Sequence, residues 1–270
     1  MGADYRMEEL MAVAVAQHLR DEEVAFIGIG TGGRAFILAV GIPLVACRLA
    51  QLSHAPNLVP MLGPLIDPDL TTLPSSLRDD YELVHWKSKA QIPEQEALDV
   101  FKCGKMDVGF VSGAQIDQYG NLNIVCIGDY ESPKVRLVGC LAQTDHSAFA
   151  KRTLIPMEHT TKNFVEKVDF ISGAGFLDGP GAREEAGLPG GGPDKVFTEY
   201  AVLGFDSKTK RMQVESLHPG VSIDTVRENT GFELLIPDDV PETPKPTPEQ
   251  VKLIRETIDP DGLLLEAKVQ

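Results

Sequence analysis

The part of this chain richest in potential chemistry is residues 112–123, Ser-Gly-Ala-Gln-Ile-Asp-Gln-Tyr-Gly-Asn-Leu-Asn. It follows a short apolar run, and open α/β sheets place ligand sites at the carboxyl ends of such strands. Gly113 and Gly120 permit backbone angles that other residues avoid. Asp117 and Asn121 can close the turn through hydrogen bonds from side chain to backbone. The pattern indicates either a ligand-binding loop or a well-built structural turn.

A second glycine-rich turn, Gly28-Ile29-Gly30-Thr31-Gly32-Gly33, follows the apolar run that begins at Val24. Its spacing fits G-x-G-x-x-G, in which glycines and a helix N-terminus hold a phosphate. Dinucleotide binding also requires an acid about 20 residues further on, for the ribose hydroxyl. No Asp or Glu occurs between Glu23 and Asp67, which argues against NAD or FAD. Close approach of another ligand and a purely structural turn both remain open.

Histidine and cysteine spacing predicts no metal site and no redox dithiol. The six histidines contain no H-x-x-x-H pair and the four cysteines contain no C-x-x-C, the spacings typical of such sites. A nucleophile elbow of the form G-x-S-x-G is also absent, so a Ser/His/Asp triad has no support. Four isolated cysteines in a chain of this length are typical of reduced core residues in a cytosolic protein.

The composition excludes several classes of protein. Of the 270 residues, 43% are hydrophobic and 24% are charged, which is enough apolar content to fill a core. The formal net charge of −15 would repel nucleic acids and anionic membrane surfaces. The most apolar run, 35–47, is shorter than the ~20 residues of a membrane span. We therefore expect a soluble, cytoplasmic protein that binds neither nucleic acid nor membrane.

Short apolar runs alternate with amphipathic segments, which predicts an α/β fold with an open, mainly parallel, doubly wound sheet. We expect strands at 24–29, 58–62, 107–113, 122–127, 135–138, 152–157, 167–171, 200–206 and 211–217. Helices are expected at 5–20, 43–52 and 92–104.

The chain is expected to form a single α/β domain over 1–239, interrupted by a Gly/Pro-rich loop at 173–194. That loop holds eight glycines and three prolines, and a long irregular connection of this kind is usually functional or mobile. Residues 240–270 are expected to form a proline-rich linker and a C-terminal helix that packs on the domain or on a partner. Thr247 would cap this helix and Pro248 would occupy its first position.

Beyond these patterns, the chain resembles the small (β-type) subunit of family I CoA-transferases, in the glutaconate CoA-transferase branch. The resemblance extends in order over nearly the whole chain. Its motifs are Gly113-Ala114-Gln115-Ile116-Asp117, Tyr119-Gly120-Asn121-x-Asn123, Ile127-Gly128-Asp129-Tyr130, Pro133-Lys134, Met157-x-His159, Val168-Asp169, Asp178-Gly179-Pro180-Gly181-x-Arg183-Glu184, Phe205-Asp206-x-Lys208-Thr209-Lys210-Arg211-Met212, Glu228-Asn229-Thr230-Gly231-Phe232 and Ile258-Asp259-Pro260.

The resemblance implies an open sheet of the CoA-transferase (NagB/RpiA-like) type and a CoA thioester as substrate, with no permanently bound cofactor. It also implies a separate α-type partner subunit, in a hetero-oligomer such as α2β2 or α4β4. In the glutaconate enzyme a glutamate of the β-type subunit, at the end of the strand after an Ala-Pro turn, attacks the thioester carbonyl. The products are an acyl-glutamyl anhydride and then a glutamyl-CoA thioester.

This chain departs from the family at that glutamate. After the turn at Ala55-Pro56, Leu62 occupies the glutamate's position, or Met61 if the one-residue gap is placed differently. No Glu occurs between Glu23 and Glu82, so sliding the alignment does not restore it. Asp67 is a weak candidate for a replacement nucleophile, since it follows the turn and would have to reach back.

Two other departures lie where the acyl group of the substrate is expected. Residues 139–145, Gly-Cys-Leu-Ala-Gln-Thr-Asp, replace the family's run of glycines, and extra length occurs at 31–39. We expect Gly139 and Gln143 to place donors near the thioester oxygen. The other predicted substrate-binding residues are Gly63, Gly113, Ala114, Gln115 and Asn121.

These departures leave three interpretations open. The first is non-transferase chemistry on a CoA thioester, namely hydrolysis, C–C cleavage or decarboxylation, with the acid/base group supplied mainly by the α-type partner. Residues 216–221 are similar to a steroid ring-cleaving hydrolase subunit, and 67–76 are more similar to a methylglutaconyl-CoA decarboxylase subunit. The second is genuine CoA transfer using another carboxylate, with Asp67 first. The third is a non-catalytic structural subunit. In all three, partner residues or backbone amides hold the CoA phosphates.

Overall fold

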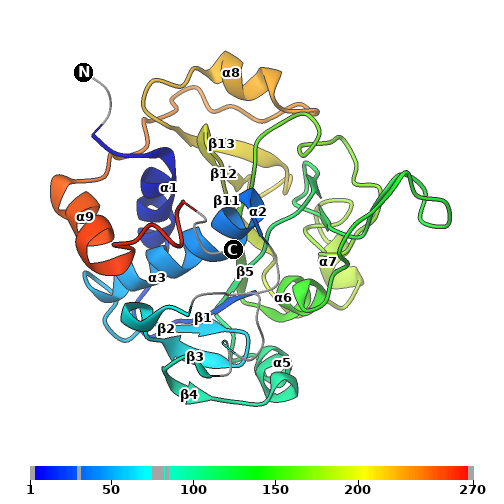
Figure 1. Cartoon of the computed structure of the whole chain (residues 1–270). Helices are drawn as coiled ribbons and strands as arrows, with labels where there is room; N and C mark the ends of the chain where they lie inside the picture. Colours follow the sequence, from blue (N-terminus) through cyan, green and yellow to red (C-terminus); the bar gives the residue numbers. More distant parts are fainter. Residues whose placement is uncertain (1–3, 29–31, 75–81, 83–84, 267–270) are drawn as a thin grey trace. The chain divides into compact units, whose positions relative to one another are not determined.

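The computed structural model describes residues 4–28, 32–74, 82 and 85–266. The chain divides into two compact units, whose elements are drawn in Figure 1. Unit 1 consists of Met1–Phe110 and Pro244–Gln270, and unit 2 is Val111–Thr243. Each unit has its own strands and helices and is described by itself.

The strands of unit 1 run in the order β5-β1-β2-β3-β4. Strands β5, β1 and β2 are parallel, whereas β2, β3 and β4 pair antiparallel. The buried faces of β1 and β2 carry Ala, Phe, Ile, Met and Leu, as the apolar runs predicted. The strand bounds are β1 Val24–Ile27, β2 Val59–Leu62, β3 Leu65–Pro68, β4 Ser88–Gln91 and β5 Val108–Phe110.

The helices of unit 1 include a continuous stretch, Arg34–Gln51, with the length and composition of a membrane span. We interpret it as a core helix, because 67% of it is buried inside the protein and its α3 part packs against α1 and η3. The helix bounds are α1 Met7–Ala16, α2 Arg34–Phe36, η1 Ile37–Gly41, α3 Ile42–Gln51, η2 Leu70–Thr72, α5 Glu94–Lys102, α9 Pro248–Leu253 and η3 Ile254–Ile258.

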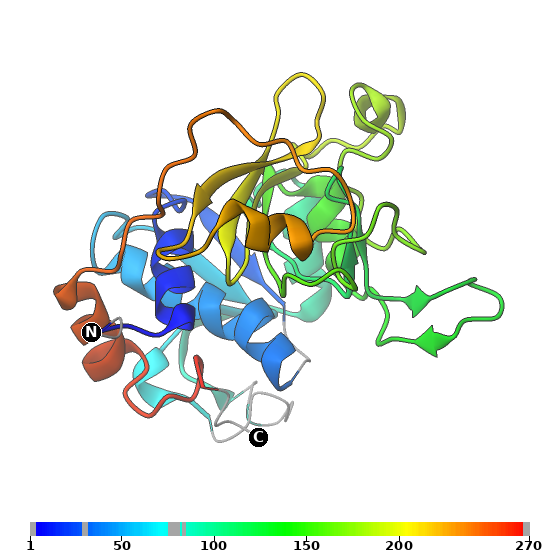
Figure 2. The same ribbon diagram turned by 90° about the horizontal axis from the view of Figure 1, so that it is seen from above.

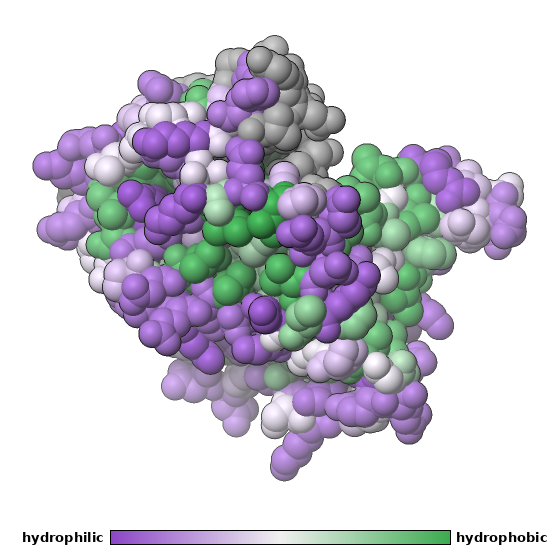
Figure 3. Space-filling view, turned by 90° about the horizontal axis from the view of Figure 1, so that it is seen from below, coloured by the Kyte–Doolittle hydropathy of each residue, from purple (hydrophilic) through white to green (hydrophobic). Residues whose placement is uncertain are grey.

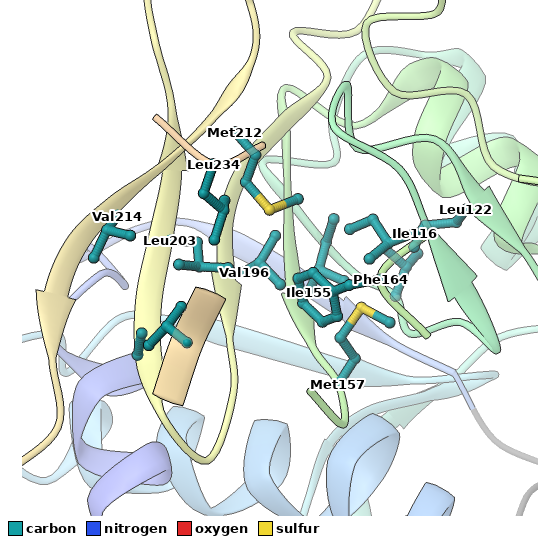
Figure 4. Close-up of a cluster of buried hydrophobic side chains, with 13 residues drawn as sticks. Ile116, Leu122, Ile155, Met157, Phe164, Val196, Leu203, Met212, Val214 and Leu234 are labelled. Carbon is teal, nitrogen blue, oxygen red and sulfur yellow. The ribbon is translucent and has the colours of Figure 1, made fainter. Parts of the chain in front are cut away.

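The longer strands of unit 2 run in the order β13-β12-β11-β10. Strands β10 and β11 are parallel, and β11, β12 and β13 are antiparallel. Their inward side chains form a hydrophobic core with Ile116, Leu122 and Phe164 from other segments of unit 2 (Figure 4). The bounds are β10 Arg152–Pro156, β11 Pro193–Phe197, β12 Ala201–Phe205 and β13 Met212–Leu217.

Two small hairpins and three short helices complete unit 2. β6 Gln115–Ile116 pairs with β7 Leu122–Asn123, and β8 Cys126–Ile127 pairs with β9 Val135–Arg136. The helices are α6 Gln143–Phe149, α7 Ala182–Glu185 and α8 Ile223–Glu228.

The predicted α/β class with a parallel sheet is confirmed, with antiparallel hairpins added at the edges. The strand expected at 167–171 is wrong: this segment is a bend, in which the Asp169 amide donates to the side-chain oxygen Oε1 of Gln115 at 3.0 Å and not to a backbone carbonyl of a neighbouring strand. Thr247 caps α9 as predicted, accepting from the Gln250 amide. The single domain over 1–239 stays a prediction, because two compact units can still unfold together.

Candidate functional site

The position at which the family's glutamate is expected lies at the carboxyl end of a parallel strand pair in unit 1. Leu62 is the last residue of β2 and pairs with Ile27 of β1. Its side chain is 1% exposed. Gly63 follows in a left-handed conformation (φ +54°), and its amide donates to the Ile27 carbonyl at 3.2 Å. The two-residue turn then closes with Leu65 opposite Leu62. The end of β2 therefore presents a buried hydrocarbon and no nucleophile.

Asp67, the weak candidate for a nucleophile, lies on β3 and is bound on both carboxylate oxygens. Oδ1 accepts from Gln51 Nε2 at 3.0 Å, and Oδ2 is 2.6 Å from Lys89 Nζ. Because β3 runs antiparallel to β2, Asp67 lies two residues past the partner of Leu62, roughly 7 Å along the strand. The geometry therefore does not favour attack by Asp67 at the end of β2.

In unit 2, the loop 112–123 is held by its own polar side chains. Gln115, 6% exposed, accepts from Asn123 Nδ2 at 2.7 Å and from the Asp169 amide at 3.0 Å. Its Nε2 donates to Asp169 Oδ2 at 3.0 Å. The Ala114 amide donates to the Asn123 carbonyl, and its carbonyl accepts from Asn163 Nδ2. The side-chain amide of Gln115 is thus used to join the loop to the bend at Asp169.

The side chain of Asn121 is also hydrogen-bonded within the protein on both its oxygen and its nitrogen. It is 2% exposed; its Nδ2 donates to Asp117 Oδ2 and to the Leu177 carbonyl, each at 2.9 Å. Its Oδ1 accepts from the amides of Gly175 and Leu177. Burial raises the pKa of Asp117, while hydrogen bonds from Asn121 and the Tyr119 amide oppose that rise. Asn121 therefore joins the loop 112–123 to the start of the Gly/Pro-rich loop.

That junction requires glycine at two points. Gly120 has φ +72°, and a Cβ there would lie 2.7 Å from Pro193 Cγ. A Cβ on Gly175 would lie 2.3 Å from the carbonyl carbon of Gly120. Gly113 is less constrained, since a Cβ at that position would lie 3.0 Å from the Gln115 carbonyl oxygen. Glycine is favoured at 175 and 113 because other parts of the backbone lie too close to leave room for a Cβ, and not because of unusual backbone angles.

Gln143 and Gly139, expected to supply donors to a thioester oxygen, both make bonds within unit 2. Gln143 Nε2 donates to the Ser112 carbonyl and its Oε1 accepts from Ser172 Oγ, each at 2.5 Å. The Gly139 amide donates to the Ile124 carbonyl at 3.0 Å. Their role as donors to the substrate stays a prediction, and for Gly139 it would require that bond to open.

The structure brings Ala114, Gln115, Asn121 and Gln143 into one hydrogen-bonded network in unit 2. Gly113 lies in the same loop, whereas Leu62, Gly63 and Asp67 belong to unit 1. The network also depends on Asp169, Ser172 and Arg183, to which the sequence analysis assigned no role. Arg183 donates to the carbonyls of Gly190, Ala174, Gly175 and Ser147 while being 3% exposed. Asp169 and Arg183 lie within the motifs shared with the CoA-transferase family, and only that membership could have predicted their importance from the sequence. Within the described ranges, no cluster of three metal-ligating side chains occurs.

Comparison with known proteins agrees with this fold. The model of the family "Coenzyme A transferase" matches residues 8–229. The chain is 33% identical to the B subunit of glutaconate CoA-transferase from Acidaminococcus fermentans, over 99% of this chain and 97% of the relative. The crystal structure of that enzyme superposes with a TM-score of 0.83 at 32% identity, covering 97% of this chain and 98% of the other. The chain is an enzyme subunit that belongs to the coenzyme A transferase family.

Two other relatives indicate the range of activities within this similarity. The chain is 35% identical to the B subunit of 3-oxoadipate CoA-transferase from Pseudomonas knackmussii, over 93% of this chain and 92% of the relative. It is 29% identical to the IpdB subunit of the cholesterol ring-cleaving hydrolase from Rhodococcus jostii, over 82% of this chain and 83% of the relative. The crystal structure of IpdAB superposes with a TM-score of 0.76 at 26% identity, covering 99% and 100% of the two chains.

Proposed function

We propose that this chain is the β-type subunit of a cytoplasmic two-subunit enzyme that acts on a CoA thioester by hydrolysis, C–C cleavage or decarboxylation. The observation that carries the proposal is Leu62, a buried hydrocarbon at the end of β2. A covalent glutamyl intermediate needs a carboxylate there. A carboxylate-free strand end is instead suited to a reaction whose acid or base comes from the α-type partner.

An α-type partner is supported by the relatives. Those most similar are B subunits by name, and the ring-cleaving relative IpdB was solved as IpdAB. We therefore propose a hetero-oligomer, α2β2 or α4β4. The net charge of −15 would repel the phosphates of coenzyme A. We propose that partner residues or backbone amides hold those phosphates.

True CoA transfer is the second candidate, and it is favoured by the 33% and 35% identity to two transferase subunits. It requires another carboxylate, with Asp67 first. The bonds from Lys89 and Gln51 to both Asp67 oxygens weigh against it, because an attacking oxygen must first lose its partner. A purely structural subunit would leave the network around Gln115 and Gln143 without a chemical role.

The test uses the chain co-expressed with its α-type partner and supplied with CoA thioesters such as glutaconyl-CoA and 3-oxoadipyl-CoA. Turnover is measured with and without acetate as acceptor, and the complex is trapped with borohydride or hydroxylamine for mass spectrometry. We expect turnover that does not depend on acetate and no adduct on this chain. An adduct on Asp67 with acetate-dependent turnover would establish the transferase instead.

Asp67→Asn provides the matched variant for this experiment. Non-transferase chemistry predicts that the variant complex retains its turnover, since Asp67 only binds Lys89 and Gln51. Loss of turnover by orders of magnitude, with the complex still assembled, would identify Asp67 as the nucleophile. Gln115→Ala combined with Gln143→Ala addresses the third interpretation: unchanged turnover in a folded complex would indicate that this chain is purely structural.

A further inference from the structure

A projecting hairpin of unit 2 has more exposed apolar surface than its own fold explains. The hairpin, residues 124–141 (hereafter the arm), contains β8 and β9 and extends from the rest of unit 2 as two green strands in Figure 2. Backbone bonds hold it together from base to tip: Gly139 to Ile124 at 3.0 Å, Leu137 to Val125 at 2.9 Å and Lys134 to Ile127 at 2.9 Å.

The arm is anchored to the rest of unit 2 at its base and beyond β8. The Ile124 amide donates to Ser172 Oγ at 3.0 Å, and the Gly128 amide donates to Asp169 Oδ2 at 3.0 Å. Tyr130 stacks on Phe170 with ring centroids 5.1 Å apart. Ser172 and Asp169 are the residues that also bind Gln143 and Gln115. The arm is therefore rigidly joined to the polar network of the candidate site.

Four large apolar side chains of the arm are exposed to solvent. Val138 is 91% exposed and Leu141 is 84% exposed; Tyr130 and Val135 are about half exposed. Six large hydrophobic side chains are exposed in the described part of the chain. Four belong to the arm, Ile171 is next to the Phe170 that Tyr130 stacks on, and Leu52 belongs to unit 1. In Figure 3 apolar side chains gather at the base of this projection, whereas its tip is hydrophilic. A rigid, concentrated apolar surface of this kind marks an interaction site.

Leu141 adds a second, independent observation. Its backbone has φ +27°, a region in which a side chain costs roughly 1 kcal/mol and glycine costs little. The strained backbone holds an apolar side chain out into water, and neither the strain nor the exposure stabilises unit 2. Strain of this kind persists where the position has a use outside the chain's own fold.

We propose that the arm is a docking surface for the α-type partner, with Val138 and Leu141 buried in an apolar recess of that subunit; this inference rests on the function proposed above. The net charge of the chain favours this occupant over a second copy. Each chain has a net charge of −15, so two copies repel. On the arm, Asp129 and Glu131 are balanced by Lys134 and Arg136. The arm thus suits a partner with an apolar recess and a neutral or basic rim.

The experiment measures binding of the full chain to the α-type subunit from the same genome, by sedimentation velocity. Val138→Asp combined with Leu141→Asp is expected to raise the Kd at least about tenfold, because each buried anchor would carry an unpaired charge. Both side chains are exposed in the free chain, so its Tm is expected to stay unchanged. The matched control, Leu52→Asp, alters an exposed leucine of unit 1 and is expected to leave the Kd unchanged.

Leu141→Gly separates docking from folding. Glycine suits φ +27°, so the variant is expected to keep the Tm of the parent while its Kd rises. If the double Asp variant binds the α-type subunit with the same Kd as the parent chain, the arm is not the docking surface. Acetate-independent turnover by the complex of that variant would leave the proposed function intact. A homodimer of the parent chain that the double variant dissolves would assign the arm to a second copy. Failure of the parent chain to bind the α-type subunit at all would overturn both proposals.

Discussion

Two buried polar side chains of unit 2, Asn121 and Gln115, are hydrogen-bonded within the protein, and this decides what they can do. Asn121 makes bonds with Asp117, Gly175 and Leu177, and Gln115 makes bonds with Asn123 and Asp169. When the donors and acceptors of a side chain are used inside the protein, the side chain fixes the conformation of a loop and has little hydrogen-bonding capacity left for a ligand. We therefore expect their substitution to affect stability first and turnover second.

Asn121→Ala tests this expectation. The substitution leaves the amides of Gly175 and Leu177 and the Asp117 carboxylate without Asn121 in a buried site. We expect the free energy of unfolding to fall by roughly 3 kcal/mol, measured by urea denaturation. Lys208→Ala, at an exposed position, serves as the control with a change near zero. An equally stable Asn121→Ala protein would show that this network is not structural.

Two buried histidines of unit 2 make its stability depend on pH. Burial lowers the pKa of His159 to about 3 and that of His218 to about 4, the latter opposed by a hydrogen bond to the Thr198 carbonyl. In the unfolded chain both titrate near 6.5, so only the unfolded chain takes up protons as the pH falls below about 6.5. Stability is therefore full above that pH and decreases down to the folded values, by roughly 2 kcal/mol for each histidine at pH 5.

The measurement is urea denaturation of the protein at pH 7, 6 and 5. His159→Gln retains a neutral polar group beside Thr198 and Thr230 and is expected to lose about half of the pH dependence between pH 7 and 5. His54→Gln, at an exposed position, is the control and is expected to retain the full slope. A parent protein equally stable at pH 7 and 5 would contradict the assignment of buried, neutral histidines.

At the scale of elements, the C-terminal segment of unit 1 packs tightly on the long core helix. A Cβ on Gly41, in η1, would lie 2.2 Å from the Leu264 carbonyl oxygen. Glu9 of α1, fully buried, binds Arg255 of η3 at 2.7 Å. Burial is the largest single effect and raises the pKa of Glu9, but the hydrogen bonds from Arg255 and Arg6 together outweigh it and lower that pKa. The segment after the proline-rich stretch is therefore part of the core of unit 1.

Gly41→Ala is expected to displace this segment and to lower the free energy of unfolding by about 2 kcal/mol. Gly28→Ala is the matched control, because a Cβ there meets nothing within 4 Å. Hydrogen exchange at residues 254–266 is expected to accelerate in Gly41→Ala alone. Equal exchange rates in the two variants would indicate that the backbone at Leu264 can move away from the new methyl group with little loss of stability.

The Gly/Pro-rich loop is organised around the guanidinium of Arg183, whose pKa is lowered by burial. Arg183→Lys replaces a guanidinium, whose five N–H donors reach several carbonyls, with a single ammonium. We therefore expect it to lower the free energy of unfolding by roughly 3 kcal/mol, nearly as much as Arg183→Met. Proteolysis within 173–192 is the local readout. Arg227→Lys, on a half-exposed surface arginine, is the control. An Arg183→Lys protein as stable as the parent would show that a positive charge, without the guanidinium's hydrogen bonds, is sufficient to hold the loop.

At the scale of the whole molecule, the chain forms two compact units, and the predicted single domain over 1–239 requires that they unfold together. The chain's one tryptophan, Trp86, is buried in unit 1, so its fluorescence reports that unit alone. Hydrogen exchange of β12 and β13 reports unit 2. A single domain predicts the same urea midpoint by both probes, and separate midpoints would indicate two independently folding units.

Periodicity and glycine spacing determined most of the strands, the α/β class and the loop 112–123, because these depend on residues near one another in the chain. Strand β11 was missed because Pro193 and Asp194 look like the end of a loop, and β3 and β4 because their residues show no apolar alternation. The absence of an acid between Glu23 and Asp67 was visible in the sequence alone. Only the tertiary structure decided the roles of Gln115, Asn121, Gln143 and Arg183. Their partners lie tens of residues away, and whether a polar group faces a ligand or the protein depends on which of those partners it meets.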